Sequence, residues 1–233
     1  MKKGSKIAVG IIAGIVIGLI TVVAFIFVFI MLFFFGGPPK VTKGVDKYEE
    51  TIKKYTTLPN GRVRTGFFVF PETIPASAFE QEEQPEFYFS YQDTWDDPTC
   101  EVYLKCVYSD ADYEAEINRI KNEHKAFGGN NKDVLYENSE RFNHPVYLAI
   151  DHHDFSYEYA MDLGDNSIAY IYTAYKSDLK SIKKIPKEYL PTDFEESLDF
   201  ENGSYWAEGN YDIYELPNST PELHNGGRDF GRN

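Results

Sequence analysis

Four consecutive residues in the second half of the chain, Asp151, His152, His153 and Asp154, form the densest group of metal-ligand types in the sequence, and His144 lies shortly before them. Imidazole nitrogens and carboxylate oxygens together suit zinc or a similar divalent ion, which would make the chain a metal-dependent hydrolase. However, neighbouring residues of a strand point to opposite faces, so His152 and His153 rarely bind the same ion. A polar turn between two strands is the competing interpretation, and a metal site at Asp151, His152 and Asp154 remains a hypothesis.

The two cysteines, Cys100 and Cys106, lie on one face of a strand that we expect over residues 99–108. Their separation along a straight strand is about 20 Å, whereas a disulfide needs Cα atoms about 5.5 Å apart. We therefore expect two buried thiols that pack as small apolar side chains. A bridge around an unrecognised turn, and an intermolecular or reactive role, are the alternatives.

Motifs of the common catalytic and nucleotide-binding classes are absent from the sequence. It contains no G-x-S-x-G, no H-E-x-x-H, no phosphate-binding loop and no G-x-G-x-x-G. S-x-x-K occurs twice in a lysine-rich stretch, without the companion motifs of penicillin-binding enzymes. We therefore expect a protein that is not an enzyme, and we assign it no cofactor. Four aromatic residues are candidates for a platform that stacks against envelope glycans, the alternative being burial in the core: Trp95, Trp206, Tyr205 and Tyr211.

The composition argues against a nucleic-acid-binding protein. The 233 residues carry 23 Lys and Arg against 37 Asp and Glu, a formal net charge of −14. Such a chain is repelled by a phosphate backbone. Aromatic residues make up 16% of the sequence, which is typical of a packed, strand-rich core.

An uncharged apolar run extends from Ile7 to Phe35, after a short basic tail over residues 1–6. As a helix the run is longer than the ~30 Å hydrocarbon layer requires, so we predict an uncleaved transmembrane signal anchor. A cleaved signal peptide is the alternative, but its apolar stretch is shorter and is followed by a small-residue cleavage site. The dense lysine block before the run favours a cytoplasmic N-terminus and an extracytoplasmic domain. The count of Lys and Arg behind the run slightly favours the reverse.

Three glycines, Gly10, Gly14 and Gly18, recur every four residues within the apolar run. They lie close to one helix face, in the G-x-x-x-G pattern that lets two membrane helices approach each other. Association into a homo-oligomer through this face is a hypothesis. The alternative is chance, because glycine is common in membrane helices.

A basic juxtamembrane stalk with a short amphipathic helix is expected over residues 36–60. Its Lys40, Lys43 and Lys47 would contact anionic lipid head groups, each contributing about 1 kcal/mol near the surface. A solvated linker helix is the alternative.

An acidic α+β domain is predicted over residues 61–216, followed by a flexible tail over 217–233. Its main amphipathic helix begins after Ser109, with Asp112 completing a capping-box pattern, and extends to about Ala126. Runs of strands around a single main helix predict an antiparallel sheet. The expected strands cover residues 63–70, 86–92, 99–108, 132–138, 145–151, 154–162 and 167–175.

Two further details of the domain follow from the same patterns. Residues 162–166 have the composition of a hairpin turn, and the strands on either side carry tyrosines that suit cross-strand pairing: Tyr157 and Tyr159 on one, Tyr170 and Tyr172 on the other. Residues 187–191 are expected to pack back onto the domain.

The sequence therefore predicts a single-pass protein of the cell membrane that presents an acidic α+β domain for binding or assembly at the cell envelope. Its expected partners are the lipid bilayer, a second copy of the chain, and an envelope protein or glycan. A metal-dependent hydrolase, and a structural or regulatory subunit of a membrane complex, are the alternatives.

Overall fold

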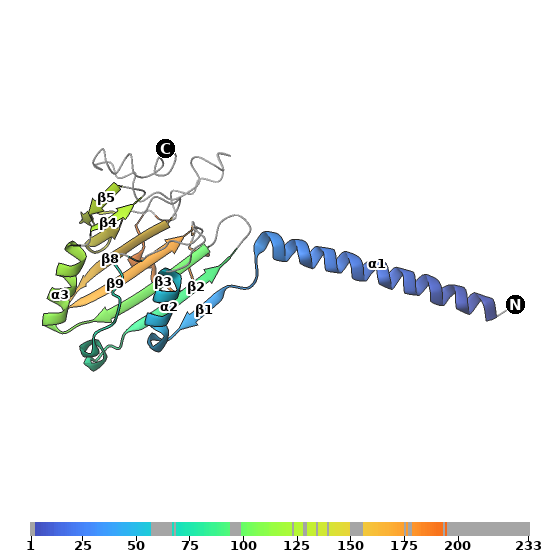
Figure 1. Cartoon of the computed structure of the whole chain (residues 1–233), viewed down its shortest axis with the longest axis horizontal. Coiled ribbons are helices and arrows are strands. Elements are labelled where there is room, and N and C mark those ends of the chain that lie inside the picture. The colour runs from blue at the N-terminus through green and yellow to red at the C-terminus, as the bar shows by residue number, and fades with distance from the viewer. Residues whose placement is uncertain are drawn as a thin grey trace.

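A long N-terminal helix projects from an α+β body built on a large antiparallel sheet (Figure 1). The structure is a computed structural model, and the residues it describes are 3–56, 67, 69–93, 99–122, 124–127, 130–133, 135–138, 140–149, 156–174, 176, 179–192 and 194.

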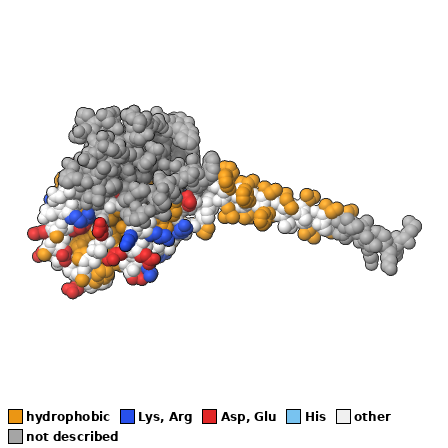
Figure 2. All heavy atoms as spheres, in the orientation of Figure 1, with side chains coloured by type: hydrophobic (Ala, Val, Ile, Leu, Met, Phe, Trp, Pro, Cys, Tyr) orange, Lys and Arg blue, Asp and Glu red, His pale blue; other side chains and the backbone are white. Residues whose placement is uncertain are grey.

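Helix α1 (Lys3–Phe35) accounts for the projecting part of the molecule. Its segment Ile12–Phe34 is long and apolar enough to cross a membrane, and none of it is buried inside the protein. Figure 2 shows apolar side chains along this helix, in contrast to the charged side chains scattered over the body. The helix ends where Gly36 adopts a φ of 70°, a left-handed conformation that commonly terminates helices and that glycine adopts without a Cβ clash.

The main sheet has seven strands in the order β1-β2-β3-β9-β8-β7-β6, and all neighbouring pairs are antiparallel. A separate hairpin pairs β4 (His124–Phe127) with β5 (Asn130–Asp133). The predicted α+β class with an antiparallel sheet is therefore confirmed. The strands of the main sheet are β1 (Lys40–Lys43), β2 (Glu86–Gln92), β3 (Thr99–Val107), β6 (Leu135–Glu137), β7 (Val146–Ala149), β8 (Ser156–Gly164) and β9 (Ser167–Ala174).

The first face of the sheet is covered by helices. They are α2 (Tyr48–Thr56), entered through the 3-10 turn η1 (Val45–Lys47), and α3 (Asp110–Lys121), with the segment 69–78 and η2 (Ala76–Glu80) between them. Their apolar side chains form one core cluster with strand residues such as Phe89, Leu104 and Tyr172.

The second face of the sheet is covered by irregular segments. Residues from 140–145 and from 179–194, including the 3-10 turn η3 (Lys187–Tyr189), form a second core cluster with strand residues such as Tyr103, Tyr159 and Ile171. The prediction that residues 187–191 pack back onto the domain is confirmed, since Leu190 is buried in this cluster.

Helix α3 begins as its capping box predicts. Ser109 accepts a hydrogen bond from the backbone N–H of Asp112, and Ile117 and Ile120 face the core. The predicted end at Ala126 is wrong, because the helix stops at Lys121 and the next residues form β4. Pairing of His124–Phe127 with Asn130–Asp133 satisfies backbone groups that a longer helix would have used.

Residues that we expected to form a juxtamembrane stalk belong instead to the folded domain. β1 pairs with β2, and Tyr48, Ile52 and Tyr55 of α2 are buried in the first core cluster. The expected strand over 63–70 is not formed at Val69 and Phe70, which lie in a bend, and residues 63–66 lie outside the described residues.

The hairpin of β8 and β9 is present, but Tyr159 does not pair with Tyr170 or Tyr172. Asp165 and Asn166 form the turn with φ values of 48° and 59°, the left-handed pair of a tight hairpin turn. The resulting register sets Tyr159 opposite Ile171 and Glu158 opposite Tyr172. Tyr159 therefore lies on the second face while Tyr170 and Tyr172 lie on the first, so the cross-strand contacts predicted for Tyr159 are absent. The side chain of Tyr157 lies outside the described part of the structure.

Both cysteines are free and buried, as predicted. Cys100 and Cys106 pack in the first core cluster, and burial raises the pKa of both thiols, to about 12 for Cys106. Protonated, buried thiols are poor nucleophiles, so neither is positioned for thiolate chemistry.

Candidate functional site

The predicted metal cluster, Asp151, His152 and Asp154, lies outside the described residues. Within the part of the chain that the structure describes, no group of three or more His, Cys, Asp or Glu side chains is placed to hold a metal ion. The four aromatic residues considered for a glycan platform also lie outside it.

The predicted membrane-linked residues lie at the helix end of the molecule. Gly14 and Gly18 are in α1, and no atom outside the helix backbone lies within 4 Å of the position where either would carry a Cβ. Gly10 lies one turn earlier in the same helix. The helix face at Gly14 and Gly18 is therefore open to another helix.

The predicted head-group contacts, Lys40, Lys43 and Lys47, are all exposed. Only residues 36–39 separate α1 from β1, and Gln92 Nε2 donates a hydrogen bond of 3.2 Å to the carbonyl of Gly37 in this connection. The helix is thus attached to the sheet at the start of β1 and the end of β2 over a very short distance.

Two charged side chains on the first face hold Val69, which has neither helix nor strand partners. Its N–H donates to Glu158 Oε1 at 2.7 Å, and its carbonyl accepts from Arg119 Nη2 at 2.6 Å. Arg119 also forms a bidentate ion pair with Glu116. The buried Glu158 and the partly exposed Arg119 hold Val69 over the sheet by satisfying backbone groups that would otherwise be unpaired.

Glu116 also ends a buried chain of tyrosines. Tyr170 Oη donates to Glu116 Oε1, and Tyr108 Oη donates to Tyr170 Oη, both at 2.8 Å. Burial raises the pKa of each phenol, and the nearby negative charge of Glu116 adds to the effect. None of these groups lines the pocket described next, and each is bonded to another, so we interpret the chain as structural.

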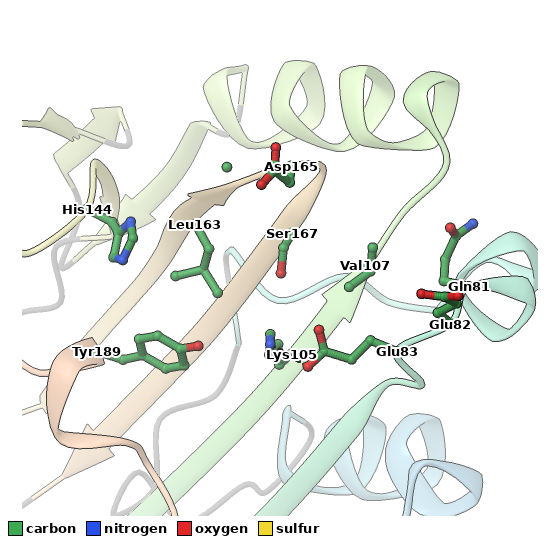
Figure 3. Close-up of a pocket in the computed structure, with 11 residues that line it drawn as sticks. Gln81, Glu82, Glu83, Lys105, Val107, His144, Leu163, Asp165, Ser167 and Tyr189 are labelled. Carbon is green, nitrogen blue, oxygen red and sulfur yellow. Dashed lines mark hydrogen bonds and ion pairs between the residues drawn. The ribbon is translucent and has the colours of Figure 1, made fainter.

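An open pocket of about 590 Å³ lies on the second face, at the end of the sheet far from α1. The strand registers give its position, because Lys40 and Tyr91 pair near α1 whereas Val107 and Ser167 pair at the opposite end. We call this feature the distal pocket, and Figure 3 shows it. Its lining residues are Gln81, Glu82, Glu83, Lys105, Val107, His144, Leu163, Gly164, Asp165, Ser167 and Tyr189.

The floor of the distal pocket comes from the sheet. Lys105 Nζ donates to Glu83 Oε1 at 2.5 Å, an ion pair within the pocket wall. Burial acts to lower the pKa of Lys105, but the hydrogen bond to Glu83 and the surrounding negative charge outweigh it and raise the pKa. Lys105 is therefore a protonated ammonium whose charge Glu83 balances.

Ser167 is the unusual residue of the floor. Its side chain points toward the middle of the ring of lining residues in Figure 3. The residue is 8% exposed, and its Oγ has no hydrogen-bond partner among the described residues. A buried hydroxyl without a partner costs about 1–3 kcal/mol, so its retention needs an explanation.

The wall formed by Tyr189 is held in place from several directions. Its ring stacks on Tyr103 at 6.2 Å between centroids, and its carbonyl accepts a 2.8 Å hydrogen bond from Tyr159 Oη. Asn143 donates to the carbonyl of the preceding Glu188 at 2.9 Å. The pocket is thus pre-formed rather than a gap between loose loops, as small-ligand sites usually are.

Comparison of this chain with protein-family models, with curated proteins and with solved structures finds no match.

The distal pocket was not predicted from the sequence. Its residues come from the segment before β2, from the far ends of three strands and from two covering segments. No local spacing of residues in the sequence therefore predicts it. The sequence signal nearest to it is Lys105, which with Glu101 is one of two charged residues in the largely apolar strand β3.

Proposed function

We propose that this chain is a single-pass membrane protein, in which α1 anchors an acidic α+β domain that serves binding or assembly at the cell envelope. The observation that carries the proposal is the surface of α1. Its large apolar side chains from Ile12 to Phe34 are 41–77% exposed, and none of this span is buried inside the described part of the protein. Burying one such side chain contributes about 1.5–3 kcal/mol, so a lipid environment stabilises the segment by an amount on the order of tens of kcal/mol.

The length and backbone of α1 support the same proposal. The 23 residues of Ile12–Phe34 rise about 34 Å as a helix, slightly more than the ~30 Å hydrocarbon layer. A helix satisfies its backbone hydrogen bonds internally, which lipid requires. A modest tilt accommodates the difference in length.

The short connection between α1 and β1 supports a domain held close to the bilayer. Residues 36–39 leave little reach, and the Gln92 hydrogen bond to Gly37 restricts them further. Lys40, Lys43 and Lys47 then lie where anionic head groups would attract them. The distal pocket lies far from the proposed membrane surface, because β3 spans on the order of 26 Å between Thr99, at the α1 end of the sheet, and Val107, which lines the pocket.

The test of anchoring uses the full chain in its native membranes. We expect the protein to remain in the membrane pellet after a carbonate wash, with a mature N-terminus that precedes Ile7. Recovery in the wash, or a first residue mapped beyond Pro39, would refute the proposal.

The orientation is tested with a cysteine at an exposed position of α3, Glu114→Cys. Cys100 and Cys106 are buried, so the unmodified chain provides an unreactive background. With the proposed cytoplasmic N-terminus and extracytoplasmic domain, a membrane-impermeant maleimide labels the variant in intact cells. Labelling only after permeabilisation reverses the orientation.

A further inference from the structure

We propose that the distal pocket binds a small organic cation, a ligand that carries an ammonium group. This inference rests on the proposed function, because it names the ligand of a domain presented for binding. It goes beyond the proposed function because the negative charge of the pocket and its unpaired hydroxyl together indicate the chemical class of the ligand.

The charge of the pocket wall is the first argument. Three carboxylates line it, those of Glu82, Glu83 and Asp165, against one ammonium, that of Lys105. Lys105 is already paired with Glu83 at 2.5 Å. Among the described residues no ion pair neutralises Glu82 or Asp165, so the wall retains negative charge that a cationic ligand would balance.

The unpaired hydroxyl of Ser167 is the second, independent argument. Its Oγ is buried on the floor of the pocket and has no partner in the described part of the chain. An N–H of an ammonium group would supply the missing hydrogen bond, with the serine oxygen as acceptor. A ligand that donates there removes a cost the unliganded protein carries.

The aromatic wall and the size of the pocket complete the argument. Tyr189 presents a ring fixed against Tyr103, and aromatic faces attract cations within about 6 Å of their centroids. Leu163 and Val107 add apolar surface for the body of a ligand. The volume of about 590 Å³ falls within the ~300–1,000 Å³ range of small-molecule sites.

The charge of the whole chain favours the same class of ligand. The net charge of −14 attracts cations and repels anions over distances of about a Debye length. The negative potential at this end of the domain disfavours the binding of an anion and favours the binding of an amine cation.

The experiment is calorimetric titration of the full chain in detergent, with phenethylamine and spermidine as cationic probes and succinate as the anionic comparison. We expect saturable binding of at least one amine and none of succinate. Binding of succinate alone, or of no probe, would overturn the inference. Binding in detergent does not require a spanning helix, so the result is independent of the carbonate test of anchoring.

Two matched variants separate the pocket from general attraction to an acidic surface. Glu82→Gln removes a lining carboxylate, and Glu80→Gln removes another exposed carboxylate that does not line the pocket. We expect a loss of affinity of about fivefold or more for Glu82→Gln and less than twofold for Glu80→Gln. Equal losses show diffuse surface binding and contradict the proposal.

Ser167→Ala tests the hydroxyl directly. Removing an unpaired buried oxygen should raise the Tm of the unliganded protein by roughly 2–4 °C, while it weakens amine binding about fivefold. If Ser167 had only a structural role, its substitution would not raise the Tm of the protein and lower its affinity for the amine at the same time. Unchanged affinity refutes the role assigned to Ser167.

Discussion

Glu101 offers the sharpest test of how this domain is held together. It lies in the middle of β3 and is fully buried, yet no Lys or Arg side chain is bonded to it among the described residues. Instead its carboxylate accepts backbone N–H groups from Lys183 at 2.9 and 3.0 Å, from Lys184 at 2.6 Å and from Ile185 at 3.2 Å. One side chain therefore satisfies three consecutive donors of a segment that has no strand partner.

The substitution Glu101→Gln keeps the shape but removes the charge and one of the four hydrogen bonds. The amide oxygen can still accept from Lys183, Lys184 and Ile185 at the position of Oε1, but the amide nitrogen at the position of Oε2 faces the N–H of Lys183. Hydrogen bonds to charged groups contribute about 1.5–3 kcal/mol each, and relief of the buried charge offsets part of the loss. We expect the segment 179–194 to lose about 2–4 kcal/mol of stability against local opening.

Limited trypsin digestion measures this opening, because Lys183 and Lys184 are themselves cleavage sites with exposed side chains. A loss of 2 kcal/mol increases the open population roughly 30-fold, and cleavage follows that population when reclosing is fast. The control Glu114→Gln removes an exposed carboxylate from α3 and should leave the cleavage rate unchanged. A cleavage rate within twofold of the parent for Glu101→Gln would show that the carboxylate does not hold the segment.

Two other outcomes follow from the structure. Gly14→Ile should leave the fold intact, since no atom outside the helix backbone lies within 4 Å of the added Cβ, and should lower the dimer signal in a membrane two-hybrid assay. An unchanged signal removes the hypothesis of association through the glycines. Burial raises the pKa of Tyr91 to about 12 and raises those of Tyr108 and Tyr170 as well, so the folded state favours neutral phenols. Their contribution is complete below the unfolded pKa of about 10 and is lost as pH rises through the folded values, which urea midpoints measured from pH 8 upward should show as falling stability. Constant midpoints across that range would contradict the assignment.

The parts of the fold that the sequence predicted correctly are those set by local signals. β2 was predicted with the bounds that the structure has, and β3 ends only one residue earlier than expected. The start of α3 was predicted because a capping serine is a local device. Its end was not, because pairing between β4 and β5 depends on a partner that the periodic stripe of α3 does not contain.

The alternation of side chains between the two faces of a sheet explains why the pairing predicted between tyrosines of β8 and β9 was wrong for Tyr159. A side chain changes face with every residue, so a two-residue turn and an irregularity between Asp162 and Gly164 decide which residues face each other. Composition identifies the turn but does not fix this register. The same limit applies to the distal pocket, where Lys105 and Ser167 meet Glu83 and Tyr189 only through the order of strands and the path of covering segments.

The two ends of the sheet carry opposite charges, which affects how a domain tethered by α1 is oriented at a membrane. Lys40 lies at the end of the sheet next to α1, after the connection over residues 36–39, whereas Glu82 and Asp165 line the pocket at the far end. An anionic bilayer attracts the first end and repels the second, and both effects fall off within about a Debye length of the surface. The sheet should therefore stand away from the membrane rather than lie on it. In that position the pocket opens to the aqueous phase, where a water-soluble cation can reach it without crossing the head groups.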